Sequence, residues 1–254
     1  MQLGITTFNI ARDWDLPFLI KKCRELGIGG LEFRSGKNQA HGVEPEISKE
    51  RRHEIRNMIE DAYLAVIGIG ASSRFDHTDK AELQNDIDSA KVCIELCADL
   101  GGKTVRVYGN DVNPDLGRDK TVKQLGECLA EVIPFGRQYG VEVLVEMHGQ
   151  FNNFSLMEDA LAASGIPDAG SIYNSDPRDI VGGSVAHAYW RARNRIKHVH
   201  VHDLCGAYPY RELFRLLKKD GYDGYISAEL PYSADGERVL AYYVETFKLL
   251  CCLS

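Results

Sequence analysis

Three histidines occupy every second position of the segment IKHVHVHDL, residues 196–204. They are His198, His200 and His202, and valines separate them. Successive side chains of a β-strand point to opposite faces, so the three imidazoles would share one face and the valines the other. If the valine face packs against helices, the imidazoles line an enclosed polar space. The segment therefore predicts a strand that contributes imidazoles to a buried site.

Polar residues also alternate with apolar ones in five further segments that favour β-strands. Their polar positions are Glu32 and Arg34; Thr104, Arg106 and Tyr108; Glu142, Glu146 and His148; Asn174 and Asp176; and Tyr225, Ser227 and Glu229. Parallel strands that are covered on both faces are mostly apolar. Polar residues at alternate positions therefore indicate a functional surface that these strands share.

Short β-rich runs recur along the whole chain, and helical patterns of apolar residues lie between them. We predict strands at 3–8, 30–34, 64–70, 103–108, 141–147, 170–174, 196–202 and 224–229, and helices at 15–27, 48–62, 79–102, 121–140 and 208–224. This repeat predicts an α/β protein with a (β/α)8 TIM barrel, a single domain over residues 1–254. A doubly wound open sheet is the alternative, but no glycine-rich phosphate-binding motif follows an early strand.

Active sites of such barrels lie at the C-terminal ends of the strands. The residues that we expect to meet there are Glu146, His148, Asn174 (or Asp176), His200 and Glu229. Oxygen ligands with a single imidazole suit a divalent cation such as Mn²⁺, Mg²⁺ or Co²⁺, and Zn²⁺ is also compatible. Two carboxylates beside a metal ion can also exchange protons with a substrate.

The two arginines of the polar faces, Arg34 and Arg106, have two interpretations that the sequence leaves equally open. They either bind a charged group of a substrate, or they are counter-ions of Glu32 and of the site carboxylates. Glu229, taken alone, could be an ion-pair partner of either arginine.

The remaining histidines have different expected roles. We expect His198, the deepest of the three on its strand, to be structural and to bond Glu142 or a buried water. His202 lies at the rim and would contact substrate or solvent. His41, in the loop GKNQAHGVE, either is exposed or covers the mouth of the barrel, and we expect it to be exposed.

Composition restricts the class of partner. The chain has 254 residues and a net charge of −7, which argues against a nucleic-acid partner. No apolar run reaches the ~20 residues that a membrane span needs, and the N-terminus lacks the pattern of a secretory signal. Seven cysteines without metal-type spacing are typical of reduced thiols in a cytoplasmic protein. The apolar tail VLAYYVETFKLLCCLS could close the bottom of the barrel or face another subunit of a homo-oligomer.

The segments VEVLVEMHG, IKHVHVHD and GYDGYISAEL resemble the sugar phosphate isomerase/epimerase superfamily, the xylose isomerase-like barrels. The resemblance implies one divalent metal held by residues that end strands five to eight, and we expect Mn²⁺, with Mg²⁺, Co²⁺ or Zn²⁺ as alternatives. Glu146, His200 and Glu229 match three of the family's four ligands. Asn174 stands where the family usually has aspartate, which makes the charge of the loaded site about zero instead of −1, and Asp176 is the alternative ligand.

The resemblance implies an isomerase or epimerase of carbohydrate metabolism that acts on a small sugar, sugar derivative or cyclitol. A substrate carbonyl would chelate the metal while Glu146 and Glu229 move a proton beside it, and His148, Arg106, Arg34 and His202 would contact the substrate. A lyase of the same family, such as an inosose-type dehydratase or a C-glycoside-cleaving enzyme, is the first alternative. A non-catalytic metal- or sugar-binding barrel is the second, because Asn174 departs from the family pattern. The E-x-x-N-R run of free-ketose 3-epimerases is absent after Glu146, and the extra histidines of the DNA-repair branch are absent from strands three and four.

Overall fold

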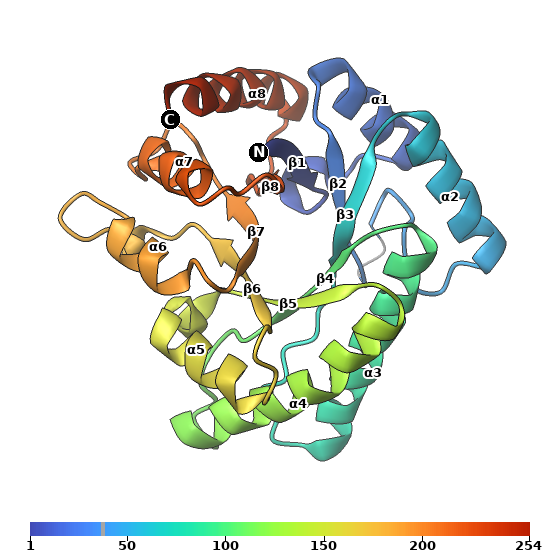
Figure 1. Cartoon of the computed structure of the whole chain (residues 1–254). Coiled ribbons are helices and arrows are strands. Elements are labelled where there is room, and N and C mark those ends of the chain that lie inside the picture. Colours follow the sequence, from blue (N-terminus) through green and yellow to red (C-terminus); the bar gives the residue numbers. More distant parts are fainter. Residues whose placement is uncertain (37–38) are drawn as a thin grey trace.

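The computed structural model describes residues 1–36 and 39–254. Its strands are β1 (Gln2–Thr6), β2 (Gly30–Arg34), β3 (Ala65–Gly70), β4 (Thr104–Tyr108), β5 (Glu142–Glu146), β6 (Gly170–Asn174), β7 (Ile196–Val201) and β8 (Tyr225–Ala228). All neighbouring strands are parallel, and β8 pairs with β1, so the sheet closes on itself (Figure 1). The predicted (β/α)8 barrel is therefore confirmed.

A helix follows each strand and packs on the outside of the barrel (Figure 1). These helices are α1 (Leu16–Leu26), α2 (Lys49–Asp61), α3 (Lys80–Asp99), α4 (Arg118–Gln138), α5 (Phe154–Ala163), α6 (Ala186–Ala192), α7 (Tyr210–Lys219) and α8 (Gly236–Leu253). The described residues also form three short 3₁₀ helices, η1 (Asn9–Ala11), η2 (Gly149–Asn152) and η3 (Pro177–Asp179), in the loops at the C-terminal ends of the strands.

Side-chain caps explain where several predicted helices begin. Asp15 accepts a hydrogen bond from the backbone N–H of Phe18, and Ser48 accepts one from that of Arg51. These bonds satisfy backbone donors that have no partner within the first helical turn. At the other end of α1, Gly27 adopts a φ of 76°, a left-handed conformation that glycine favours. The sequence therefore predicted the first residues of α1 and α2 to within one position.

Two expectations for the last part of the chain are wrong. The helix predicted at 208–224 is confined to α7, because the chain turns at Gly221, whose φ is 77°. Of the two alternatives for the C-terminal tail, closing the bottom of the barrel is wrong, and contact with another subunit stays a prediction. The tail forms α8, which packs against α7 and α1 and completes the outer ring of helices (Figure 1).

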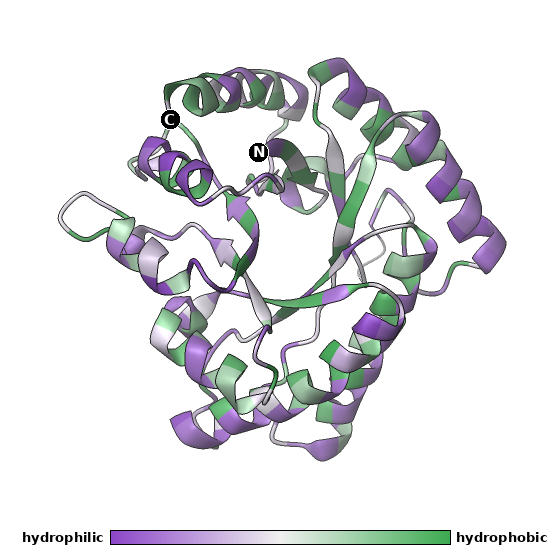
Figure 2. Ribbon diagram, viewed as in Figure 1, coloured by the Kyte–Doolittle hydropathy of each residue, from purple (hydrophilic) through white to green (hydrophobic). Residues whose placement is uncertain are grey.

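The hydrophobic core lies between the barrel and its helices (Figure 2). The valines that alternate with polar residues in β4, β5 and β7 are all buried, and they are Val105, Val107, Val143, Val145, Val199 and Val201. Burying one such side chain contributes roughly 1.5–3 kcal/mol relative to leaving it exposed. Because these valines face outward against the helices, the polar positions between them face the interior of the barrel.

Two bulges adjust the polar faces of neighbouring strands. The register between β2 and β3 shifts at Glu32, where Ile67 is the extra residue. A Cβ atom added to Gly4 would lie 2.3 Å from the Ile67 side chain, so this isoleucine fills the bottom of the barrel interior. The second shift, between β6 and β7, leaves Asn174 directly opposite His200. Bulges of this kind commonly re-aim side chains beside functional sites.

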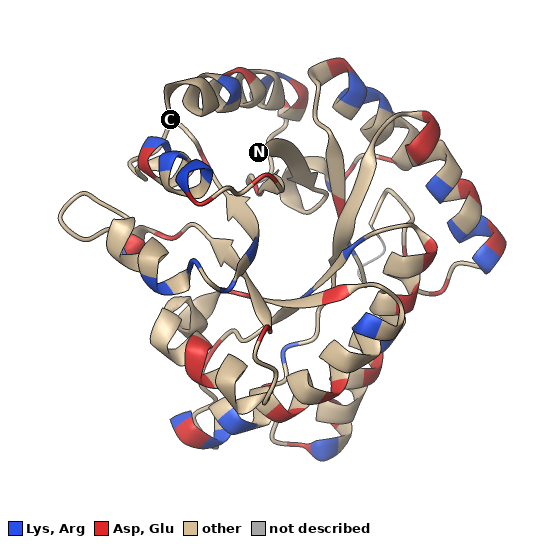
Figure 3. Cartoon of the chain, viewed as in Figure 1, with Lys and Arg blue, Asp and Glu red and all other residues tan. Residues whose placement is uncertain are grey.

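The outer surface carries both signs of charge. Basic and acidic side chains are interspersed over the helices that Figure 3 shows. In the part of the chain that the structure describes, no helix is both long and apolar enough to cross a bilayer. All seven cysteines are free thiols, and four of them, Cys23, Cys93, Cys97 and Cys128, are buried in the core.

Candidate metal centre and active site

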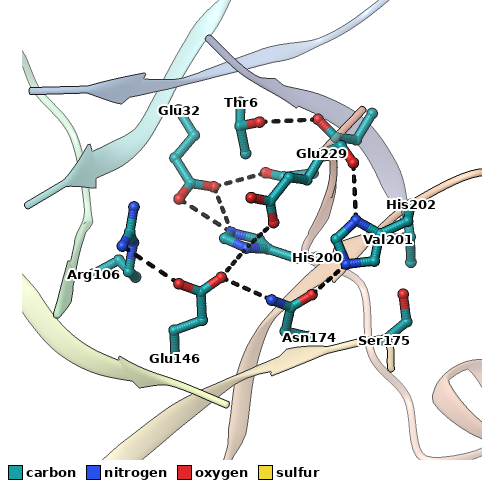
Figure 4. A network of polar contacts seen from close by, with 12 residues as sticks. Thr6, Glu32, Arg106, Glu146, Asn174, Ser175, His200, Val201, His202 and Glu229 are labelled. Atoms are coloured by element: carbon teal, nitrogen blue, oxygen red, sulfur yellow. Dashed lines mark hydrogen bonds and ion pairs between the residues drawn. The ribbon is translucent and has the colours of Figure 1, made fainter. Parts of the chain in front are cut away.

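Four of the predicted site residues meet at the C-terminal end of the barrel interior (Figure 4). Glu146 and Asn174 end β5 and β6, His200 lies near the end of β7, and Glu229 directly follows β8. Glu146, Asn174 and His200 are almost fully buried, while the Glu229 side chain is 24% exposed. Glu229 therefore lies on the side of the site that a substrate can reach.

The His200 ring lies between carboxylates on both of its edges (Figure 4). Its Nδ1 atom is 3.0 Å from Glu146 Oε1 and 3.4 Å from Glu229 Oε2. Its Nε2 atom is 3.0 Å from Glu32 Oε2. Burial opposes the charged imidazolium, but Glu32 and Glu146 outweigh it and raise the pKa of His200 well above its ordinary value.

Two overlapping groups of side chains could hold a metal ion, and their ligand atoms lie within 4.8 Å of one another in each group. The lower group contains Glu32, His198 and His200. Its Glu32 Oε2 atom already accepts a hydrogen bond from Ser227 Oγ at 2.9 Å and lies 3.1 Å from His198 Nε2. The lower group is therefore a hydrogen-bonded network that is satisfied without an ion.

The upper group contains Glu146, His200 and Glu229. Glu229 Oε2 is buried and has no hydrogen-bond partner among residues 1–36 and 39–254. A buried carboxylate oxygen is costly unless a cation or a donor compensates it, and His200 Nδ1, 3.4 Å away, compensates this one only while the imidazole is charged. Two carboxylates and one imidazole also form a donor set that suits divalent ions. The upper group therefore fits a divalent metal. The lower group is suited to hold the ligands of the upper group in place.

Glu32 determines which nitrogen of His200 is available to an ion. A ring that ligates a metal is neutral, so one nitrogen keeps its proton. The Glu32 carboxylate can accept that proton's hydrogen bond from Nε2, which leaves the lone pair of Nδ1 facing Glu146 and Glu229. This is the carboxylate–histidine–metal arrangement that orients imidazole ligands.

The amide of Asn174 bridges the upper group and His202 (Figure 4). Its Nδ2 atom donates to Glu146 Oε1 at 3.0 Å, and its Oδ1 atom lies 2.8 Å from His202 Nε2. The other His202 nitrogen, Nδ1, lies 2.9 Å from the Glu229 carbonyl oxygen and donates to it. With this amide orientation, His202 has to donate from both nitrogens and carries a positive charge.

Rotating the Asn174 amide by 180° gives an alternative network with a neutral His202. The amide Nδ2 then donates to His202 Nε2, and Oδ1 faces the ligand atoms of Glu146 and His200. The two orientations exchange atoms of nearly equal size, so the hydrogen-bond partners decide between them. A cation in the upper group favours the rotated amide, and His202 then holds Asn174 in the orientation that a ligand requires.

Asp176 has other partners than the upper group. Its carboxylate accepts hydrogen bonds from the backbone N–H, Nε and Nη2 of Arg178 and caps η3. Asn174, and not Asp176, therefore contacts the candidate ligands in this structure.

Arg106 lies beside Glu146, and the distance from Nη1 to Glu146 Oε2 is 3.4 Å. Burial raises the pKa of a carboxyl group, but the charges of Arg106 and His200 outweigh it and lower the pKa of Glu146 to about 2. Glu146 is thus held as a carboxylate. Of the two predicted roles of Arg106, the counter-ion contact is observed.

Two other predicted residues, His148 and His198, lie around this centre. His148 is exposed at the rim, where its Nδ1 atom lies 2.8 Å from Asn110 Oδ1. His198 is buried as expected, but its partners are Glu32 and Ser227, so the expected bond to Glu142 is wrong. Glu32, which contacts both His198 and His200, was not among the predicted site residues.

The expectation that His41 is exposed is wrong. Only 3% of the residue is accessible, and the backbone N–H of Val43 donates to its Nδ1. Its Nε2 therefore carries the proton and donates to Thr7 Oγ1, which also accepts a hydrogen bond from the backbone of Arg34. His41 anchors its loop to the ends of β1 and β2.

We expect His41 to make the protein less stable in mild acid. Burial, the largest cause, lowers its pKa from 6.5 to about 4. Between these two pH values the unfolded chain binds the extra proton, so the free energy of unfolding decreases as the pH falls from 7 to 4, by up to about 3 kcal/mol from this residue. Urea unfolding of the wild type and of His41→Asn at pH 7 and pH 4.5 measures this, with the exposed His53→Asn as the control. An equal loss of stability in His41→Asn and wild type would contradict the assignment.

Comparisons with known proteins agree with this fold. Residues 20–248 match the model of the family described as xylose isomerase-like TIM barrel. None of the curated proteins matches the sequence. Among solved structures, L-ribulose 3-epimerase is 19% identical, with a TM-score of 0.82, and the match covers 99% of this chain and 95% of that one.

Two further solved structures are similar over nearly their whole lengths. The 3-keto-D-glucoside 4-epimerase YcjR from E. coli is 17% identical, with a TM-score of 0.79 and 98% of both chains covered. The IOLI protein, solved with a binding zinc atom, is 17% identical, with a TM-score of 0.78, and the match covers 98% of this chain and 96% of that one. At these identities the likeness establishes the shared fold.

Proposed function

Because the chain belongs to the xylose isomerase-like TIM barrel family, we propose that it is a divalent-metal-dependent isomerase or epimerase of a small sugar, sugar derivative or cyclitol. One observation carries the proposal: Glu146 and Glu229 both approach His200 Nδ1, and Glu229 Oε2 is buried without a hydrogen bond in the described part of the chain. The names of similar structures, which include sugar epimerases and a zinc-containing protein, support the same class.

The proposed ligands are Glu146, Asn174, His200 and Glu229. A divalent ion bound there would supply a Lewis acid that stabilises negative charge developing on a substrate. We favour Mn²⁺, because three oxygen donors and one imidazole suit it, and Mg²⁺, Co²⁺ and Zn²⁺ are compatible with the same donors.

The environments of the two glutamates assign them different roles. Glu146 is held as a weak base, because its pKa is lowered to about 2 by Arg106 and His200 in spite of burial. Glu229 is the more exposed of the two, and its Oε2 has no hydrogen bond. Glu229 therefore removes a proton from the carbon beside the substrate carbonyl. Glu146, a carboxylate at rest, first takes a proton from solvent or from a substrate hydroxyl and then delivers it to the opposite face of that carbon. Pairs of carboxylates whose environments differ commonly divide acid and base roles in this way.

Other side chains would position the substrate. His148 lies at the rim beside the ring of Tyr108, and His202 lies between Asn174 and the Glu229 carbonyl. Arg106 and Arg34 lie on the side of β2, β3 and β4. We assign these four residues to substrate contacts.

Exchange with solvent tests the proposed chemistry. The manganese-loaded protein is incubated in D₂O with a panel of ketoses and inososes, and products are followed by NMR and mass spectrometry. We expect deuterium on the carbon beside the carbonyl and a product isomeric with its substrate. A product that has lost water or an aglycone would instead indicate the lyase chemistry of the same family.

The substitution Glu32→Gln is expected to weaken metal binding, although residue 32 is not one of the proposed ligands. Glu32 holds the Nε2 proton of His200, and losing such a partner typically lowers metal affinity by about 10- to 100-fold. Isothermal titration with Mn²⁺ measures the effect. Glu142→Gln, at the opposite end of the same barrel, is the matched control. Equal manganese affinity in Glu32→Gln and wild type would remove Glu32 from this role.

A further inference from the structure

Arg34 and Arg106 line one small cavity together with Glu32, His200 and Glu229. Both arginines are only 8% exposed. They come from β2 and β4, with β3 between them, and they approach the upper metal group from the side opposite β7. Two buried guanidinium groups in one cavity repel each other, so their arrangement needs a compensating feature.

Arg106 is poorly satisfied for a buried arginine. Within residues 1–36 and 39–254 its side chain donates no hydrogen bond: Nε is buried without a partner, and Nη1 has only the 3.4 Å ion-pair contact with Glu146 Oε2. Its Cζ atom lies 3.9 Å from the ring centroid of Tyr108, which fixes the plane of the guanidinium. A Cβ atom at Gly70 would lie 2.8 Å from Nη2, so glycine leaves the space that this group occupies. Arg106 is therefore held in place with no hydrogen bond from its guanidinium and one ion-pair contact, to Glu146.

Arg34 is anchored more firmly and still keeps one free donor. Its Nη1 donates to the Ala71 carbonyl at 3.1 Å, and its Nη2 donates to Ser72 Oγ at 2.9 Å. Its Nε is buried without a partner in the described residues. Burial and then the nearby charge of Arg106 lower the pKa of Arg34. The β3–α3 loop thus holds Arg34 beside Arg106 despite their repulsion.

The charges around this cavity do not balance when a metal ion is added. Glu32, Glu146 and Glu229 supply three negative charges, and the two arginines supply two positive ones. A divalent ion with neutral imidazole ligands leaves one surplus positive charge in a buried site. Aspartate at position 174 would cancel that charge, but the chain has asparagine there.

We propose that the substrate of this site is a hydroxycarbonyl compound with one carboxylate, which Arg106 and Arg34 bind beside the metal centre. The inference rests on the proposed function and specifies its substrate class. A carboxylate supplies one negative charge and two coplanar acceptor oxygens, which match the planar fork of a fixed guanidinium. A phosphate group would bring up to two negative charges into a site that has a surplus of one positive charge.

Three achiral ligands isolate the carboxylate from the stereochemistry of an unidentified sugar. Dihydroxyacetone, hydroxypyruvate and dihydroxyacetone phosphate share a hydroxyketone and differ in one terminal group. Their dissociation constants are measured by isothermal titration on the manganese-loaded full chain. Because a charge-assisted hydrogen bond is worth about 1.5–3 kcal/mol, we expect hydroxypyruvate to bind on the order of 100-fold more tightly than dihydroxyacetone. Equal affinity of these two, or a preference for the phosphate, would overturn the proposed substrate class.

Variants of the two arginines test whether Arg34 and Arg106 cause the preference for hydroxypyruvate. Arg34→Met and Arg106→Met are each expected to reduce the preference for hydroxypyruvate over dihydroxyacetone by about 10-fold or more. Arg215→Met, on the exposed side of α7, should leave the preference unchanged. The ratio of the two affinities is the readout, since Arg106 also contacts the ligand Glu146 and its loss can alter metal binding. A ratio that both variants preserve would contradict the assignment.

The substitution Asn174→Asp is expected to change manganese affinity and the preference for hydroxypyruvate in opposite directions. The added carboxylate should increase manganese affinity and decrease the preference for hydroxypyruvate, because it removes the surplus charge. Manganese titration without any ligand tests the metal centre separately. If the protein does not bind manganese but still prefers hydroxypyruvate through its arginines, the carboxylate site is supported and the proposed function is contradicted. If it binds manganese without that preference, the proposed function is supported and the carboxylate site is contradicted.

Discussion

Replacing Glu229 by glutamine is expected to lower kcat on the order of 1,000-fold and to leave the fold intact. The substitution keeps the size of the side chain and one oxygen that can ligate, but it removes the group that accepts a proton. The wild-type carboxylate is suited to this role because its Oε2 atom has no competing hydrogen bond among the described residues.

Three measurements make this result specific. Circular dichroism and thermal unfolding report on the fold, manganese titration reports on the metal, and deuterium exchange reports on proton removal. Glu237→Gln, on the exposed first turn of α8, is the control. Undiminished exchange in Glu229→Gln would show that another group is the base.

Replacing His200 by asparagine is expected to reduce manganese affinity by about 100-fold or more. His200 is the one residue common to both candidate groups. Its Nδ1 atom lies 3.0 Å from Glu146 Oε1 and 3.4 Å from Glu229 Oε2, the two carboxylate ligands of the upper group. Losing a direct ligand removes a bond to the ion and also leaves Glu146 and Glu229 facing each other without the imidazole.

His198→Asn is the matched control for this prediction. His198 lies two positions deeper on the same strand face, is equally buried, and shares Glu32 as a partner. We expect its loss to lower stability while manganese affinity changes by less than about 10-fold, because it acts only through Glu32. Larger losses of manganese affinity in His198→Asn than in His200→Asn would assign the ion to the lower group.

The barrel could be predicted from sequence because its signals are local. Valines alternate with polar residues in β4, β5 and β7, and cap residues such as Asp15 and Ser48 precede the helices. The same alternation predicted which side chains face the interior. The C-terminal ends of the strands then followed from the fold, and the structure brings Glu146, Asn174, His200 and Glu229 together there.

The parts that sequence could not predict depend on contacts across the barrel. Glu32 and His200 are 168 positions apart and meet only because β2 and β7 face each other across the closed sheet. An acidic residue on β2 next to Arg34 suggested a local ion pair. The histidine partners became visible only with the closure of the barrel.

His41 and Asn174 show two further limits. The loop around His41 folds back onto Thr7, and no local pattern distinguishes such a loop from an exposed one. For Asn174, the sequence indicates that the usual aspartate is replaced, but not that His202 lies against the amide. That contact gives the asparagine a way to present its oxygen to a cation.

The central claim is that a divalent ion occupies the upper group of this barrel, and anomalous diffraction from manganese-soaked crystals tests it most directly. The account predicts one manganese peak in contact with Glu146, His200 Nδ1 and Glu229, with the oxygen of Asn174 turned toward the ion and its nitrogen toward His202. A peak among Glu32, His198 and His200 instead, or no peak at either group, would contradict it.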